Sequence, residues 1–192
     1  MIQKIGVLGG TFDPIHFGHF SLARSSYEEL NLDKIILVPT NYPWLKKPLS
    51  LTESSHRIKM IELFIKNKSW LELSNIDILR GGNSYTKDTL KELKTIFSKR
   101  TKMYLIIGSD SLNDLSKWKD HSRIVELAEI VVAKRPGFEI NLKDHQDFIV
   151  LNSSMLNISS TIVRDNIKKG LSIDELISLE VKNYINNNKL YT

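Results

Sequence analysis

Two histidines near the start of the chain, His16 and His19, have the type and the spacing to bind one anion between them. They follow a short apolar run, residues 5–8, and a turn that begins at Gly9 and Gly10. Glycine has no Cβ, so its backbone can turn sharply and let a bulky anion approach the amides. A spacing of three places both imidazoles on one face of a helical turn. The segment therefore predicts a phosphate-binding loop.

The residues around the histidines favour a helix start at this loop. Pro14 fixes φ where the chain enters the predicted helix, and a helix N-terminus carries unpaired amides and roughly half a positive charge. A plain strand-to-helix turn with ordinary polar histidines is the simpler interpretation, but the strand, the glycines, the proline and the paired histidines together favour the phosphate site. Zinc ligation is a third interpretation. Because the chain has no cysteine and zinc sites use three or four protein ligands, we predict no metal at His16 and His19.

A second candidate anion site lies near the end of the chain, where residues 158–164 read Ile-Ser-Ser-Thr-Ile-Val-Arg. Hydroxyl groups at a helix start either cap the helix or turn toward a ligand, and an arginine one turn further along offers charge-assisted hydrogen bonds to phosphate. Helix capping alone would explain the hydroxyl groups. In combination with the histidine loop, this segment favours a triphosphate site.

The apolar runs indicate which fold must hold these two loops together. Six strand-like runs alternate with segments of helical periodicity, which predicts an α/β fold: a Rossmann-like open, mostly parallel sheet with helices on both faces. We predict a single domain over residues 1–192, with a small C-terminal helical extension at about 158–192. The strand-like runs are residues 5–8, 35–38, 71–78, 103–107, 130–133 and 148–151, and the clearest helices are 52–67 with Thr52 as N-cap, 86–97, 161–169 ended by Gly170, and 174–187.

The unusual residues of the chain fall at one edge of this predicted sheet. In an open parallel sheet, ligands bind beyond the carboxyl ends of the strands, near the point where the strand order reverses. Separate stretches of the chain converge there, which is stronger evidence than any one motif. These stretches are Gly9 to Thr11 after the first strand, Pro39-Thr40 with Lys46-Lys47 after the second, Gly108-Ser109-Asp110 after the fourth, and residues 157–161 after the last.

The composition limits the possible partners and the compartment. The chain has 192 residues, with 27 Lys and Arg against 22 Asp and Glu, and the net charge of +5 suits a polyanionic partner such as a nucleotide. Basic and acidic residues are interspersed, so most form solvated helix faces and no nucleic acid is expected as the main partner. The lack of cysteine and of long apolar runs favours a cytoplasmic protein without a membrane partner. A homo-oligomer is compatible with these residues, which fix no oligomeric state.

The two loops together resemble the nucleotidylyltransferase superfamily, whose hallmarks are His-x-Gly-His and Ile-Ser-Ser-Thr-x-x-Arg. Residues 84–86 (Ser-Tyr-Thr), residues 108–118 and Arg135-Pro136-Gly137 are similar to those of the bacterial nicotinate-mononucleotide adenylyltransferases, and the similarity spans almost the whole chain. The similar phosphopantetheine adenylyltransferases are shorter and usually carry Ser-Phe-Asp-Pro, where this chain has Thr11-Phe12-Asp13-Pro14.

The resemblance implies transfer of AMP from ATP to nicotinate mononucleotide, with Mg²⁺ accompanying the ATP. Because the attacking phosphate is already an anion, catalysis reduces to alignment and charge neutralisation around the α-phosphorus, with no protein base or covalent intermediate. The expected catalytic residues are His16, His19, Arg164 and Lys46. The expected ATP contacts are Gly9, Gly10, Thr11, Phe12, His16, His19, Gly108, Asp110, Arg135, Ile158, Ser159, Ser160, Thr161 and Arg164.

The second substrate requires an aromatic surface and a group that reads a carboxylate. Trp118 lies in a polar stretch, which favours stacking on a flat pyridine ring, with core anchoring as the alternative. Tyr85 and Thr86 begin a predicted helix, whose N-terminus favours an anion such as the nicotinate carboxylate. Asp110 follows Gly108 and is expected either to bind a ribose hydroxyl or to cap a helix.

Three basic residues are expected near the acceptor. The resemblance favours Arg57 at the ligand-binding edge, with a plain surface charge as the alternative. In the family, the loop after the second strand often contains Pro-His-Lys, whereas this chain reads Pro43-Trp44-Leu45-Lys46-Lys47. Either lysine is therefore a candidate for the phosphate contact, and Lys46 is slightly favoured over Lys47.

Two other functions remain open at this point. One is the same transfer to nicotinamide mononucleotide or to phosphopantetheine, and residues 84–86 and Trp118 argue against the latter acceptor. The other is a nucleotide- or RNA-binding module without turnover, against which the presence of His16, His19 and Arg164 speaks.

Overall fold

A six-stranded parallel sheet forms the centre of the protein, and the computed structural model describes residues 2–45, 50–112, 114–134, 148–154 and 156–192. The strand order is β4-β2-β1-β6-β7-β8, and every neighbouring pair is parallel. The chain runs outward from β1 to β4 and then crosses back to β6, so the strand order reverses between β1 and β6. The predicted open parallel sheet is confirmed. Its strands are β1 (Lys4–Gly10), β2 (Lys34–Pro39), β4 (Leu71–Leu73), β6 (Lys102–Gly108), β7 (Glu129–Lys134) and β8 (Ile149–Ser154).

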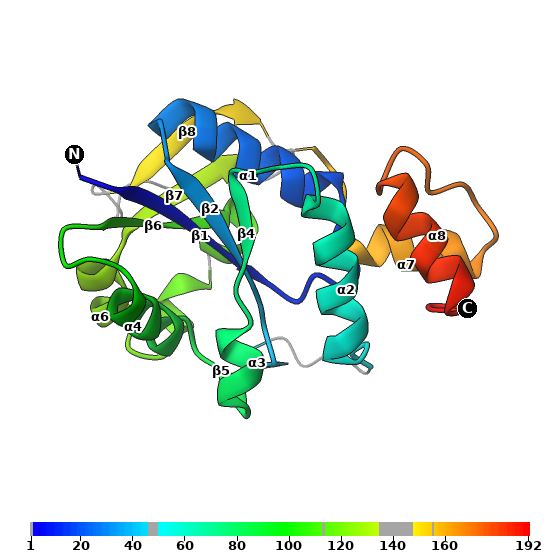
Figure 1. Ribbon diagram of the computed structural model, residues 1–192, viewed down its shortest axis with the longest axis horizontal. Helices are drawn as coiled ribbons and strands as arrows, with labels where there is room; N and C mark the ends of the chain where they lie inside the picture. Colours follow the sequence, from blue (N-terminus) through cyan, green and yellow to red (C-terminus); the bar gives the residue numbers. More distant parts are fainter. Residues whose placement is uncertain (1, 46–49, 113, 135–147, 155) are drawn as a thin grey trace.

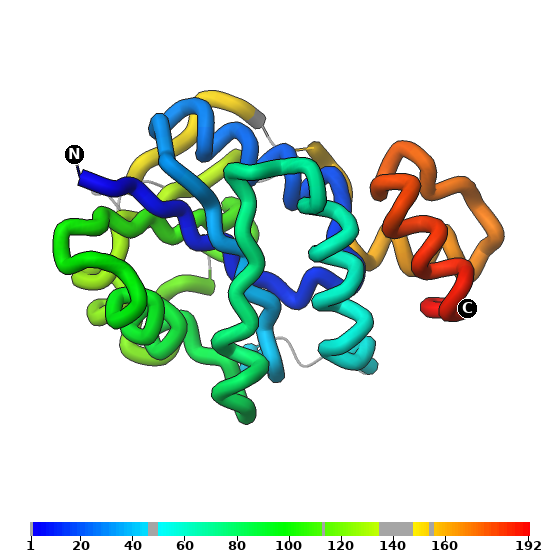
Figure 2. The backbone as a smooth tube through the Cα atoms, viewed as in Figure 1, coloured from blue at the N-terminus to red at the C-terminus, as the bar shows by residue number. Residues whose placement is uncertain are grey.

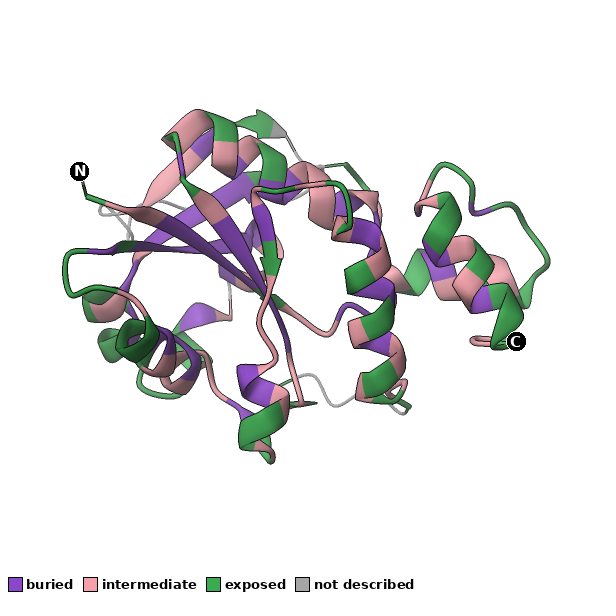
Figure 3. Cartoon of the chain, viewed as in Figure 1, coloured by how far each residue is buried: buried purple, intermediate pink, exposed green. Residues whose placement is uncertain are grey.

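Helices cover both faces of the sheet, as predicted (Figure 1). Along β2, Ile35 and Leu37 belong to the core that includes α1 and α2, whereas Ile36 and Val38 belong to the core that includes α4 and α6. This alternation follows from the two-residue period of a strand. The buried residues are concentrated along the strands between the helices (Figure 3). The helices are α1 (Phe17–Leu30), α2 (Ser54–Ile65), α3 (Ile76–Arg80), α4 (Thr86–Ile96), α5 (Ser109–Leu112), η1 (Leu115–Lys117), α6 (His121–Leu127), α7 (Ser160–Lys168) and α8 (Leu179–Asn187).

Two predicted boundaries in the first half of the chain are wrong. The run 71–78 is a strand only as far as Leu73, because the chain then turns into α3 and buries Ile76 and Asp77 beneath the edge of the sheet. The helix predicted over 52–67 begins at Ser54. Thr52 does not cap it, because Glu53 occupies the N-cap position, and the backbone amide of Thr52 donates to the carboxylate of Asp13.

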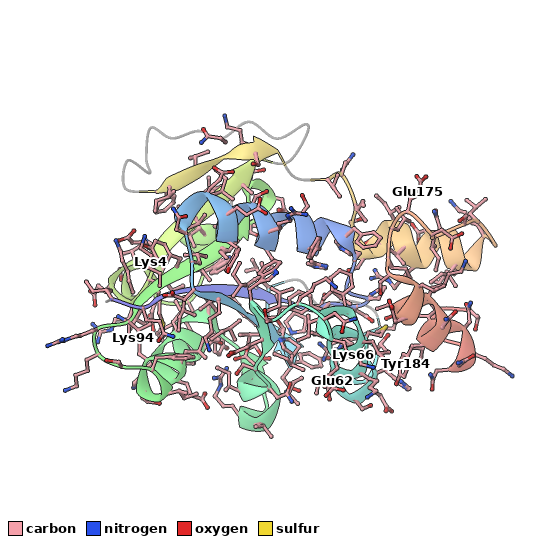
Figure 4. The ribbon with its side chains drawn as sticks, turned by 45° about the horizontal axis from the view of Figure 1, so that its top comes forward. Lys4, Glu62, Lys66, Lys94, Glu175 and Tyr184 are labelled. Atoms are coloured by element: carbon pink, nitrogen blue, oxygen red, sulfur yellow. The ribbon has the colours of Figure 1, made fainter. Side chains whose placement is uncertain are left out.

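The last two helices form the C-terminal extension, which lies beside α2 at one end of the molecule (Figure 2). Gly170 ends α7 with a φ of +67°, as expected for a helix stop. The helix predicted from 174 begins only at Leu179, because the Ser178 hydroxyl accepts a hydrogen bond from the Val181 amide and caps α8 there. Tyr184 on α8 faces α2, where its hydroxyl lies 2.9 Å from Nδ1 of His56 (Figure 4).

Two short strands form a second, separate sheet. Strand β3 (Tyr42–Pro43) pairs in parallel with β5 (Asn83–Ser84), which links the segment after β2 to the start of α4. None of the helices in the described part of the chain is long and apolar enough to cross a bilayer.

Candidate active site

The two histidines of the first loop hold each other in place. His16 is the N-cap of α1, and its Nδ1 accepts from the His19 amide at 3.3 Å, while Nδ1 of His19 accepts from the His16 amide at 3.3 Å. The rings are stacked, with centroids 3.7 Å apart. Because both Nδ1 atoms accept hydrogen bonds, the proton of each neutral ring lies on Nε2. The loop therefore presents two Nε2 donors on rings whose orientation is fixed.

The expected position of Pro14 relative to the helix is wrong. Helix α1 begins at Phe17, so Pro14 precedes the first turn by three residues instead of opening it. The two histidines nevertheless share the start of α1, one as the cap and the other at the third helical position. The proposed anion would contact the N-terminus of α1 through the side chains of His16 and His19.

The glycine between the histidines allows the two motif loops to touch. A Cβ on Gly18 would lie 2.8 Å from the carbonyl oxygen of Ile158 and 2.9 Å from Nδ1 of His16. Both distances are too short for real atoms, and the first involves backbone that cannot rotate away. Gly18 is therefore required for the close approach of residues 158–164 to α1.

We expect Gly18→Ala to lower the free energy of unfolding by about 1–3 kcal/mol, because the added methyl forces the two loops apart. Urea denaturation measures this change. Gly9→Ala is the matched control, since no atom lies within 4 Å of a Cβ at Gly9, and its effect should stay within about 0.5 kcal/mol. Equal losses in the two variants would show that loop contact does not explain Gly18.

The second motif is bonded directly to the first. Oγ of Ser160 donates to the carbonyl of Pro14 at 2.9 Å, and Nη1 of Arg164 donates to the carbonyl of Asp13 at 2.7 Å. The other guanidinium nitrogen, Nη2, donates to Oγ1 of Thr161 at 3.3 Å. The hydrogen bonds to the carbonyls of Pro14 and Asp13 join residues about 150 positions apart in the sequence. Residues 13–19 and 159–164 therefore form one structural unit.

A cavity of about 560 Å³ lies over the carboxyl ends of β1 and β6, where the strand order reverses. This is the position expected for a ligand in an open parallel sheet. Most of the residues predicted from the sequence to bind a ligand line it together. They are Gly9, Gly10, Thr11, His16, His19, Thr86, Gly108, Asp110, Trp118, Ile158, Ser159, Ser160, Thr161 and Arg164.

Several of these lining residues settle alternatives that the sequence left open. Ser159 caps α7 by accepting from the Ile162 amide, and it also lines the cavity, so capping and lining are combined. Trp118 packs against the core of the α4 face and lines the cavity as well. Asp110 lies inside the first turn of α5, so the N-cap interpretation for it is wrong.

Phe12 does not lie where an ATP contact would require it. Its side chain is completely buried and is absent from the cavity wall. The ring packs against the imidazole of His19, with centroids 4.7 Å apart, and the residue has a φ of +48°. The Phe12 ring therefore supports the imidazole of His19, and the predicted contact between Phe12 and ATP is wrong.

The predicted role of Arg57 in acceptor binding is also wrong, because Arg57 is a buried residue with 1% of its surface exposed. Its Nη1 donates to the carbonyls of Thr11 and Thr40, both at 2.8 Å, and its Nε donates to the carbonyl of Thr52 at 2.9 Å. Burial lowers the pKa of Arg57, and the negative charge of Asp13 opposes that shift. The guanidinium ties the loop after β1 to the end of β2.

Other predicted binding residues lie outside the cavity wall or outside the described part of the chain. Tyr85 precedes α4, where its ring packs against Trp44 with centroids 5.5 Å apart and lies under Nζ of Lys119, and it does not line the cavity. Its neighbour Thr86 does. The predicted phosphate contacts Lys46 and Lys47 and the predicted ATP contact Arg135 lie outside the described residues.

A hydrogen bond between residues near the two ends of the chain was not predicted from the sequence. The hydroxyl of Tyr191 donates to Oδ1 of Asp13 at 2.6 Å, and the amide of Thr52 donates to Oδ2 at 3.2 Å. Burial and the charge of Asp13 both raise the pKa of Tyr191. No local pattern signals a contact over 178 positions. The cavity wall also includes Thr40 and Ser84, which belong to stretches that the sequence placed at the ligand-binding edge or compared with the family. It further includes Trp44, Asp77, Thr89, Ser111 and Asp114, for which no individual contact was predicted.

Comparison with known proteins gives consistent similarities. The cytidylyltransferase-like family model matches residues 7–166. The chain is 39% identical over 197 residues to the probable nicotinate-nucleotide adenylyltransferase of Dictyoglomus turgidum, covering 98% of this chain and 96% of that protein. It is 37% identical over 190 residues to the one of Bacillus licheniformis, covering 99% of both. Among solved structures, Plasmodium falciparum nicotinic acid mononucleotide adenylyltransferase complexed with NaAD has a TM-score of 0.81 at 25% identity, covering 98% of this chain and 97% of that one.

Proposed function

The chain belongs to the cytidylyltransferase-like family, and from that premise we propose that it transfers AMP from ATP to nicotinate mononucleotide. The products are nicotinate adenine dinucleotide and pyrophosphate, and the reaction is a step of NAD synthesis. The observation that carries the proposal is the bonding of the histidine loop to residues 159–164 around one cavity at the switch point of the sheet. Relatives that match this chain over almost their whole length carry the same activity in their names.

The chemistry follows from charge placement. An oxygen of the acceptor phosphate attacks the α-phosphorus of ATP, the bond from that phosphorus to the bridging oxygen breaks, and its electron pair leaves with pyrophosphate. Negative charge therefore grows on the phosphates that depart. We place the Nε2 donors of His16 and His19 and the guanidinium of Arg164 around this charge, because donors that are already fixed in place stabilise a developing charge without reorganisation.

We propose that Mg²⁺ enters with ATP and is held mainly by phosphate oxygens and water. Within the described ranges, no group of three or more His, Cys, Asp or Glu side chains is placed to hold a metal ion. The Mg²⁺ ion would neutralise phosphate charge next to the donors of the histidine loop.

The acceptor is proposed to occupy the other half of the cavity. Trp118 supplies an aromatic face for the pyridine ring, and Thr86 lies at the N-terminus of α4, whose dipole favours the nicotinate carboxylate. Lys46 is the proposed contact to the acceptor phosphate, with Lys47 as the alternative. The proposed ATP contacts lie after β1 and at the start of α7, whereas the proposed acceptor contacts are Thr86 at the start of α4 and Trp118, so each substrate has its own residues in the wall of the same cavity.

A pyrophosphate-release assay with ATP and Mg²⁺ tests the function directly. We expect turnover with nicotinate mononucleotide, slower turnover with nicotinamide mononucleotide, and none with phosphopantetheine. Equal rates with the acid and the amide would contradict the assignment of the carboxylate to Thr86. Absence of pyrophosphate with every acceptor would identify a nucleotide-binding module and overturn the proposal.

A further inference from the structure

A buried carboxylate lies in the part of the cavity proposed for an anionic acceptor. Asp77, on α3, has 4% of its surface exposed, yet it lines the cavity together with Thr86 and Trp118. Oγ1 of Thr89 donates to Oδ1 of Asp77 at 2.5 Å. Thr89 follows Thr86 by three positions on α4, so both hydroxyl groups lie on one face of that helix. An unbalanced negative charge here would repel the carboxylate of nicotinate.

Arg80 balances that charge from behind the cavity wall. Its Nη2 lies 2.5 Å from Oδ1 of Asp77, and its Nη1 lies 2.7 Å from Oε2 of Glu92 on α4. Arg80 itself does not line the cavity. Burial lowers the pKa of Arg80, but Asp77 and Glu92 outweigh that effect and raise it overall, so the guanidinium stays charged.

The burial of Asp77 distinguishes the Asp77–Arg80 pair from the exposed ion pairs of the surface. The side chain of Asp77 is 6% exposed, so solvent screens it weakly, and a nearby charge in the cavity is affected more strongly than it would be in water. In exposed pairs such as Arg24–Glu28, by contrast, solvent screens both charges. The Asp77–Arg80 pair lies where its balance changes the field that the acceptor meets.

We propose that Arg80 is a positioning residue for substrate choice: by neutralising and fixing Asp77, it lets the cavity beside Thr86 accept an anionic acceptor in preference to its amide. This inference rests on the proposed function and deepens it. The two mononucleotides share the phosphate, the ribose and the pyridine ring, and they differ only in carboxylate against carboxamide. Their ratio of kcat/KM therefore isolates the charge at that one position.

The test compares that ratio in Arg80→Gln, Asp77→Asn and the double variant, at saturating ATP. Arg80→Gln leaves Asp77 unbalanced and should lower the acid-to-amide ratio about tenfold. Removing the carboxylate as well should bring the ratio back to within about threefold of the wild-type value. Asp77→Asn alone leaves the positive charge of Arg80 without its partner and should raise the acid-to-amide ratio. Glu92→Gln is the matched control, because Glu92 pairs with the same guanidinium but lies outside the cavity wall, and the ratio should not change.

The possible outcomes separate this inference from the proposed function. If Arg80→Gln slows both acceptors equally, Arg80 is only structural and the inference is overturned. If Arg80→Gln does not fold, Asp77→Asn decides, and an unchanged ratio in that variant overturns the inference. A wild-type protein that releases no pyrophosphate with nicotinate mononucleotide would reject the proposed function itself. Arg80→Lys keeps the charge and should keep the preference for the acid.

Discussion

Replacing His19 with alanine is expected to slow pyrophosphate release about 10²–10³-fold at saturating substrates, the usual cost of losing one fixed donor to a developing negative charge. The Nδ1 atom of His19 is held by the His16 amide at 3.3 Å, so the ring presents Nε2 in a set direction. A rapid-quench measurement of a single turnover separates this loss from any change in product release. Nucleotide affinity should fall less than the rate, because the charge grows only in the transition state.

His16 needs a second variant, since it has a structural role as well. His16→Ala also removes the N-cap of α1, at a cost of about 1 kcal/mol in the free energy of unfolding. Asparagine is a good N-cap but has no Nε2 donor, so His16→Asn should recover the stability without recovering the rate. His56→Ala is the control, because His56 faces Tyr184 on α8 and is absent from the cavity wall. A His19→Ala variant with a rate within threefold of the wild type would reject the proposed role.

The parts of the site that the sequence could predict depend on short-range patterns. His16, His19 and Gly18 lie within four positions of one another, and a strand, a glycine turn and a helix start suffice to place them. The edge of the sheet was predictable for a similar reason, since the alternation of six apolar runs with helical segments predicted a mostly parallel sheet, and the carboxyl ends of parallel strands meet at one edge. Residues such as Gly108 and Ser160 were then located by the end of a strand or the start of a helix.

The parts that were wrong or missed depend on partners far along the chain. Whether Arg57 faces a ligand or the core depends on the carbonyls of Thr11 and Thr40, and no pattern around Arg57 indicates them. Phe12 is adjacent to the phosphate loop in sequence, yet its positive φ turns the ring into the core. Asp77 was assigned to a strand because Ile76 and Ile78 resemble the continuation of β4. These positions are fixed by tertiary packing, which overrides local propensity.

Arg57→Met is expected to be the most destabilising substitution near the site, with a loss of about 3 kcal/mol in the free energy of unfolding. Methionine fills much of the space but donates no hydrogen bond, so the carbonyls of Thr11, Thr40 and Thr52 lose a donor in a buried setting. The melting temperature should fall by roughly 6–12 °C for a chain of this size. Denaturant unfolding should give a lower midpoint with an unchanged m-value, the pattern of a change in stability alone.

Arg57→Lys separates charge from geometry in this interaction. Lysine keeps a positive charge near Asp13 but has one nitrogen in place of the guanidinium fork, so it cannot reach the three carbonyls together, and we expect only partial recovery. Arg24→Met is the matched control, because Arg24 is exposed and pairs only with Glu28, and its effect should stay within about 0.5 kcal/mol. Equal stability of Arg57→Met and the wild type would mean that water satisfies these carbonyls. The loop after β1 would then depend on Asp13, Tyr191 and Arg164 for its position.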